Sequence, residues 1–198
     1  MYKKELKFQR VVCLLALISA ALVFVYALGI MTDLYDSFYF TMRNPDDLTE
    51  TKVPGSIIYY DMQDFNALLL RVSIGLILAA CLLFITNSQV RRKYYIGNYV
   101  AVCIAVVCNL VTTVWAHIQI EAFKHQYQTT VDFAALEEYA EGRANVLYTT
   151  STFWFDIHYL VFGVLIIASI LLVVNTVWKM KLMKEEKELL ANGKGAAA

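Results

Sequence analysis

The sequence predicts an all-α integral membrane protein: a bundle of four transmembrane helices with both termini in the cytoplasm and a small extracytoplasmic cap built from two loops. Its composition favours this class, because 59% of the 198 residues are hydrophobic and only 17% are charged, against about 25% in soluble domains. Four apolar runs of roughly 20 residues or more match the length that crosses about 30 Å of hydrocarbon. The predicted transmembrane helices are residues 11–31, 67–86, 96–118 and 153–178.

The first predicted helix follows a basic N-terminal segment that contains Lys3, Lys4, Lys7 and Arg10. Lys and Arg near the ends of transmembrane helices stay on the cytoplasmic side, so this segment predicts a cytoplasmic N-terminus. A basic segment before an apolar run also suits a signal peptide, but this run is longer than the apolar part of a typical one. We therefore interpret it as a retained helix.

Residues 32–66 form the first predicted outer loop, in which seven acidic residues outnumber two basic ones. An aromatic stretch at residues 35–40 is expected to continue the first helix along the membrane interface, where amphipathic rings are favoured. After Pro54 and Gly55, residues 56–60 are expected to form a short strand.

The second and third predicted helices are joined by a short turn that contains Arg91, Arg92 and Lys93. The three basic residues place this turn in the cytoplasm. Asn109 lies near the middle of the third run, where its amide is expected to form a hydrogen bond with a neighbouring helix.

Residues 119–152 form the second predicted outer loop, which is again acidic. Within it, residues 131–141 are expected to form a short amphipathic helix that stops at Gly142. Both loops hold many aromatic residues, so we expect them to fold into a cap or to bind a partner. The membrane domain covers residues 1–178, and residues 179–198 are expected to form a cytoplasmic helical tail.

The four cysteines, Cys13, Cys81, Cys103 and Cys108, all lie within apolar runs. Neither outer loop contains a cysteine, so no disulfide holds the exterior together. The chain also contains no Asn-x-Ser/Thr sequon. These two observations favour a bacterial cytoplasmic membrane.

Several polar residues fall at similar depth near the outer ends of the predicted helices: Arg71, His117, Glu121, Asp156 and His158. Charged residues within spanning segments are costly and seldom accidental. The first interpretation is structural: Arg71 pairs with Asp156 or Glu121, or extends along its own stem to the headgroups, and the histidines are hydrogen-bonded in the headgroup region. A proton or ion pathway is an alternative. Asp156 and His158 are two residues apart, so on one regular helix they cannot face the same site.

The same layer of residues supports two cofactor hypotheses. His117, Glu121 and His125 are spaced four residues apart, so a continuous helix would bring them to one side. With one residue of the fourth helix, such as His158, these imidazole and carboxylate groups would suit Zn, Mn or Fe. The second hypothesis is a haem held by His117 and His158. Outside these two hypotheses, we expect no cofactor.

Motifs that would indicate an enzyme are absent. The sequence contains no P-loop, no His-Glu-x-x-His zinc-protease motif, no Gly-x-Ser-x-Gly elbow and no outward-facing Cys-x-x-Cys pair. We therefore expect a non-enzymatic accessory or interaction subunit, with the lipid bilayer and either other membrane-protein subunits or its own copies as partners, and no nucleic acid. The alternatives are a metal- or haem-dependent membrane enzyme or electron carrier, and a small oligomeric transporter or channel.

The predicted topology, with two outer loops and both termini inside, is similar to that of claudin-like tetraspan proteins. The first outer loop contains neither Trp nor Cys, and the tetraspanin Cys-Cys-Gly motif is absent from the chain. The resemblance is therefore one of topology and implies no function.

Overall fold

The computed structural model describes residues 2–31, 42–44, 47–51, 53–87, 95–139, 141 and 151–195. Four of its helices are long and apolar enough to cross a membrane. The prediction of a multi-pass integral membrane protein with four spanning helices is therefore confirmed by helix length and composition.

The four long helices are α1 (Tyr2–Gly29), α4 (Gln63–Asn87), α5 (Tyr95–Thr130) and α9 (His158–Gly195). A one-turn helix, α8 (Phe153–Asp156), precedes α9. Two helices extend well beyond the predicted transmembrane segments: α5 continues past residue 118 to Thr130, and α9 continues past residue 178 to Gly195, where a helical tail is predicted. The reason is physical: an apolar run marks where the hydrocarbon ends, whereas a helix can continue into the headgroups and water with its backbone hydrogen bonds intact.

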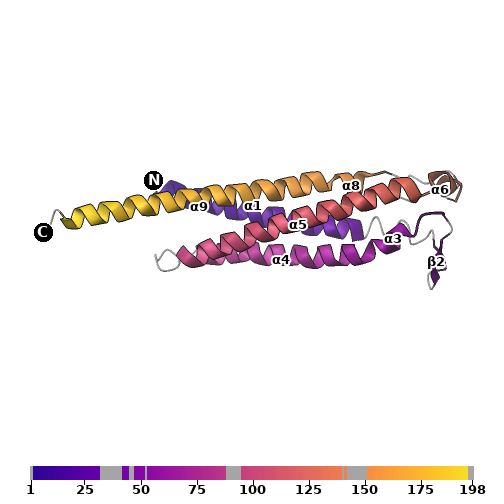
Figure 1. The fold of residues 1–198 in the computed structure, drawn as a ribbon, viewed down its shortest axis with the longest axis horizontal. Helices are drawn as coiled ribbons and strands as arrows, with labels where there is room; N and C mark the ends of the chain where they lie inside the picture. Colours follow the sequence, from indigo (N-terminus) through magenta and orange to yellow (C-terminus); the bar gives the residue numbers. More distant parts are fainter. Residues whose placement is uncertain are drawn as a thin grey trace.

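The long helices form a ring in which neighbours run in opposite directions. α1 packs against α4 and α9, and α5 packs against the same two helices. Figure 1 shows an elongated bundle with both chain termini at one end. The opposite end carries α3 (Ile58–Asp61), α6 (Phe133–Tyr139) and β2 (Asp47–Thr51). We call these two ends the terminal end and the loop end.

Buried apolar side chains fill the interior of the ring in two groups, one toward each end. Alanines allow the helices to approach closely, and Ala16 and Ala20 of α1 and Ala105 of α5 are all buried. On the outside, large apolar side chains such as Leu78 and Leu160 are exposed by 65% and 64%. An outer surface of this kind suits contact with lipid rather than water.

The two loops contact each other at the loop end. Strand β1 (Met42–Asn44) pairs antiparallel with β2 in the first loop. The backbone N–H of Asp132 donates to the carbonyl oxygen of Pro54 at 3.0 Å and so joins the second loop to the first. Next to this bond, Gly55 has a φ of +81°, and a Cβ there would lie 1.9 Å from the carbonyl oxygen of Thr130. Only glycine fits this close approach.

The strand predicted at residues 56–60 is wrong, because the turn before α3 and α3 itself occupy this segment. Its isoleucines and tyrosines favour strands, but a strand also requires a partner. Ser56 instead donates from its Oγ to the carbonyl oxygen of Val53 at 2.8 Å, and Ile58 is fully buried. Packing and turn formation therefore outweigh the local strand preference.

The helix predicted at residues 131–141 is present as α6. Its first turn is capped by Asp132, whose Oδ1 accepts hydrogen bonds from the backbone N–H groups of Ala134 and Ala135 at 3.0 Å each. The predicted stop at Gly142, the aromatic stretch at residues 35–40 and the basic turn at residues 91–93 lie outside the described residues.

Candidate functional site

The candidate site lies toward the loop end, between α5 and the junction of α8 and α9. Because α5 continues beyond its apolar run, it carries His117, Glu121 and Lys124 on successive turns. Opposite them, α8 ends at Asp156 and α9 begins at His158. The site therefore joins two long helices that pack against each other along the bundle.

A histidine pair forms the centre of the site. His117 Nδ1 lies 2.9 Å from His158 Nε2, and the two rings are stacked with an interplanar angle of 30°. The other nitrogen of the buried His158, Nδ1, bonds to the carbonyl oxygen of Phe155. A carbonyl oxygen can only accept, so His158 carries its hydrogen on Nδ1. Neutral His158 therefore accepts at Nε2 a hydrogen bond from the Nδ1–H of His117.

Glu121 lies beside the histidine pair. Its Oε1 is 3.9 Å from His158 Nε2, and it accepts a hydrogen bond from the Tyr159 hydroxyl at 2.8 Å. One nitrogen or carboxylate oxygen from each of His117, Glu121 and His158 lies within 4.8 Å of the others. We call these three residues the His–Glu group.

A separate ion pair lies next to the His–Glu group. The Lys124 ammonium contacts Asp156 Oδ1, and the Thr152 hydroxyl donates to Asp156 Oδ2 at 2.6 Å. The predicted pairing of Asp156 or Glu121 with Arg71 is therefore not observed. Asp156 and His158 both contact side chains of α5, although they are only two residues apart and Ile157 between them has a right-handed helical backbone.

His125 and Arg71 lie apart from this site. His125 is exposed on α5 and does not belong to the His–Glu group, contrary to the predicted four-residue set. At about 100° per residue, His125 is rotated by about 80° from His117, whereas Lys124 is only about 20° away. Arg71 is exposed on α4, and it makes no ion pair within the described part of the chain.

Asn109 donates from its amide nitrogen to the Ser169 hydroxyl at 2.9 Å. Both residues are buried, and the bond joins α5 to α9. Asn109 is thus placed where the sequence predicts an interhelical hydrogen bond.

A second polar group, at the terminal end, is not evident from the sequence. Asn98 accepts a hydrogen bond from the Lys179 ammonium at 2.9 Å and donates to Asn87 Oδ1. The same Asn87 oxygen accepts a hydrogen bond from Gln9. These four residues come one from each long helix, so the chain of hydrogen bonds connects the whole ring. Each of the four residues lies near the end of an apolar run. From the sequence alone, a polar side chain at such a position is expected to contact water or headgroups.

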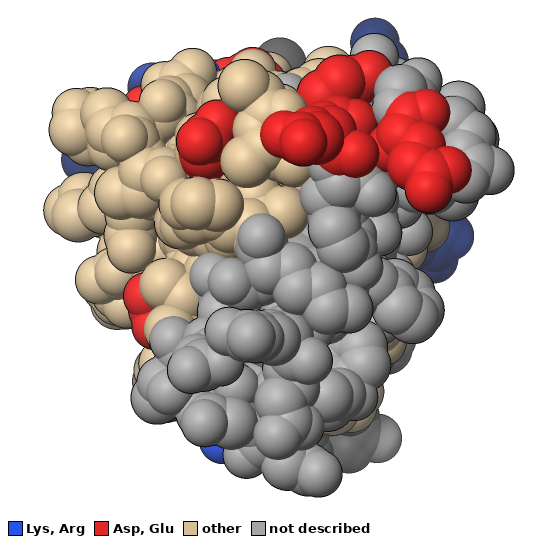
Figure 2. All heavy atoms as spheres, turned by 90° about the vertical axis from the view of Figure 1, so that its right-hand side faces the viewer, with Lys and Arg blue, Asp and Glu red and all other residues tan. Residues whose placement is uncertain are grey.

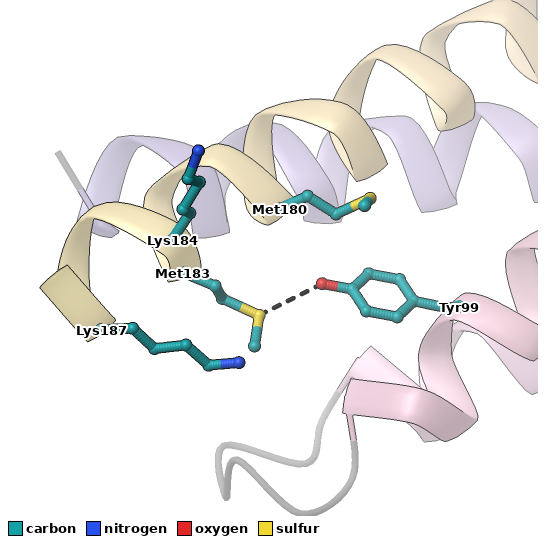
Figure 3. A pocket seen from close by; sticks show the side chains of 5 residues that line it. All are labelled: Tyr99, Met180, Met183, Lys184 and Lys187. Carbon is teal, nitrogen blue, oxygen red and sulfur yellow. Dashed lines mark hydrogen bonds between the residues drawn. The ribbon is translucent and has the colours of Figure 1, made fainter.

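A pocket of about 260 Å³ also lies at the terminal end, between α5 and α9. Figure 3 shows Tyr99 reaching from α5 toward the methionines of α9, with its hydroxyl bonded to Met183 Sδ at 3.1 Å. The remaining lining residues are Met180, Lys184 and Lys187. This lining offers no imidazole or carboxylate, and within the described residues the cluster of three possible metal ligands is the His–Glu group at the loop end.

The surface of the loop end is acidic where it is described. Figure 2 views this end directly, with Asp and Glu side chains in several groups across it and Lys and Arg seen mainly around its rim. The exposed acidic residues there include Asp61, Asp64, Asp132, Glu137 and Glu138.

Comparisons of the chain with known protein families, curated proteins and solved structures give no match. Fold and site together define the class: a multi-pass membrane protein of four long helices, with a His–Glu group between the third and the fourth of them.

Proposed function

We propose that this chain is a non-enzymatic interaction subunit that assembles in the membrane with another membrane-protein subunit. The observation that carries the proposal is Arg71, a charged residue on the outward face of α4 within the apolar run. The proposed partner is a transmembrane helix that brings a carboxylate to the level of Arg71.

The depth of Arg71 supports a partner. Its Cα is four residues beyond Ala67, where the apolar run begins, which is about 6 Å along the helix axis. Ionisable groups at such depth usually face the interior of a bundle and pair with one another. Arg71 instead faces outward, and Asp156, its expected partner, is held by Lys124.

The surface beside Arg71 has a shape that suits a helix. A groove of about 160 Å³ lies between α4 and α5, lined by Leu68, Val72, Val111, Thr112 and Trp115. Lipid-facing apolar surface alone does not drive helix association, because lipid tails are equally apolar. An ion pair with Arg71 would attract the partner helix. Side chains of that helix that enter the groove would fix its position along α4 and α5.

The proposal is tested by native mass spectrometry of the full chain after mild detergent extraction from its own cells. We expect a complex with a second subunit for the wild type and for Arg71→Lys, and at least about tenfold less complex for Arg71→Leu. Leu78→Ala changes an exposed residue on the same helix and serves as the control, for which we expect no loss.

A charge exchange makes the test specific. Once the second subunit is identified, Arg71→Glu combined with a lysine at the partner's carboxylate should restore the complex that either change alone abolishes. Equal amounts of complex for the wild type and Arg71→Leu would contradict the proposal. Phospholipid as the sole companion of Arg71 would contradict it too, because Arg71 would then simply extend to the headgroups.

A further inference from the structure

We infer that His117, Glu121 and His158 bind a divalent transition-metal ion of the zinc type between α5 and α9. The site is independent of the Arg71 surface and goes beyond the proposed interaction role. The inference rests on the geometry of three ligand atoms, the hydrogen bonds that orient them and the charge around them.

The three ligand atoms are close to a metal-binding arrangement. In a tetrahedral zinc site, bonds of about 2.0–2.2 Å place neighbouring ligand atoms about 3.3–3.6 Å apart. The two histidine nitrogens are 2.9 Å apart, and Glu121 Oε1 is 3.9 Å from His158 Nε2. These two separations need to change by about half an ångström, while the third, between His117 and Glu121, lies within 4.8 Å and must close further for all three groups to bind one ion. The same 2.9 Å contact leaves no room for a haem iron and its porphyrin between the two rings.

The surrounding hydrogen bonds resemble those that orient metal ligands. A metal-binding histidine commonly donates its second ring N–H to a carbonyl or carboxylate, which fixes the tautomer and aims the lone pair at the metal. The Phe155 carbonyl has this role for His158, whose Nε2 faces His117 and Glu121. Tyr159 holds the Glu121 carboxylate in the same way through its hydroxyl.

The charge balance also favours a cation. Lys124 is the nearby basic side chain, and its ammonium is already paired with Asp156. With both histidines neutral, Glu121 leaves one negative charge within the group. His158 is 1% exposed and the Glu121 side chain 37% exposed, so one ligand is fixed inside the bundle while another is open to an entering ion.

The chemical types of the three ligands indicate which metal ions the site would bind. Two imidazoles and one carboxylate suit Zn²⁺ and similar borderline ions, whereas Mg²⁺ and Ca²⁺ prefer oxygen ligands throughout. Binding needs no net loss of a proton from neutral His117, because its hydrogen can move from Nδ1 to Nε2. Three protein ligands leave a fourth position for water or for a group from another molecule.

The test measures metal binding by the full chain in detergent, after removal of metal with EDTA. The apoprotein is dialysed against Zn²⁺ or Mg²⁺, bound metal is counted by mass spectrometry, and the affinity for Zn²⁺ is measured by competition with a coloured chelator. We expect one Zn²⁺ per chain and no retained Mg²⁺. Substitution of Co²⁺ should give the visible absorption bands of a four- or five-coordinate ion.

Matched variants locate the site. His117→Ala and Glu121→Gln should each weaken Zn²⁺ binding by at least about 100-fold, since even groups that only orient metal ligands are worth about 10–100-fold. Both residues are partly exposed, so these variants avoid the folding risk of replacing the buried His158. His125→Ala is the control, because it removes the third histidine of the chain from the same helix outside the group.

Three results would overturn the inference: less than one Zn²⁺ per chain in the wild type, equal losses in His125→Ala and His117→Ala, or retained Mg²⁺ in place of Zn²⁺. Arg71→Leu should bind Zn²⁺ as tightly as the wild type. The interaction role and the metal site can therefore fail independently of each other.

Discussion

Asparagine side chains in the bundle have very different surroundings. Asn98 bonds to groups on α4 and α9, and Asn109 bonds to Ser169. Asn175 of α9 is also buried, but its Oδ1 has no hydrogen-bond partner among the described residues. Hydrogen bonds between transmembrane helices are worth roughly 0.6–2 kcal/mol each. Burial alone therefore does not tell which asparagine stabilises the fold.

Asn98→Ala should destabilise the protein by about 1–3 kcal/mol, because it removes both the acceptor of the Lys179 hydrogen bond and the donor to Asn87. Asn175→Ala makes the same chemical change and removes an oxygen that is already without a partner, so we expect little loss or a small gain. Unfolding of the two variants in detergent by added SDS, followed by circular dichroism, compares them directly. A loss for Asn175→Ala as large as that for Asn98→Ala would contradict this assignment.

At the residue level, the sequence predicts Asn109 better than Asn98. Asn109 is surrounded by apolar residues along the chain, so its need for a partner can be recognised without a structure. Asn98 and Lys179 lie beside the ends of apolar runs, where water or headgroups could equally well solvate them. Only the packing of four helices shows that both are buried.

At the level of helices, the sequence predicts which segments cross the membrane but not how each helix is rotated. The apolar runs identify α1, α4, α5 and α9, yet they end well before α5 and α9 do. The sequence predicts that Arg71 meets Asp156, but α4 packs against α1 and α5, Arg71 is exposed on its outer face, and Asp156 pairs with Lys124. The depth of a side chain in the membrane follows from its position in the chain. The partner of that side chain depends on how its helix is rotated about its axis, which tertiary packing determines.

The contact between α1 and α8 depends on a glycine at the end of α1. A Cβ at Gly29 would lie 2.2 Å from the Trp154 ring, so Gly29→Ala would displace the indole, and we expect a loss of about 1–3 kcal/mol. A Cβ at Gly75 of α4 would meet nothing within 4 Å. Gly75→Ala is therefore the matched control and should leave stability unchanged or raise it by up to about 1 kcal/mol. Thermal unfolding in one detergent measures both variants, and equal melting temperatures would show that Trp154 moves away at no cost.

At the level of the whole molecule, charge is distributed unevenly between the two ends. The terminal end carries the basic N-terminal segment and the lysines that begin the tail, while the described part of the loop end is rich in Asp and Glu (Figure 2). Between the ends, exposed apolar side chains cover the outside of the ring. From the positive-inside rule, we expect the terminal end to face the cytoplasm and the loop end to face outward.

The orientation predicts which positions react with a membrane-impermeant maleimide on intact cells. Glu137 of α6 and Glu188 of α9 are both exposed acidic residues, one at each end of the bundle. In a background without the native cysteines, Glu137→Cys should be labelled on intact cells, whereas Glu188→Cys should be labelled only after the membrane is permeabilised. The cysteine-free chain, treated identically, gives the background signal. Labelling of Glu188→Cys on intact cells, with Glu137→Cys protected, would reverse the orientation, and the His–Glu group would then lie near the cytoplasmic face and meet the metal pool of the cytoplasm.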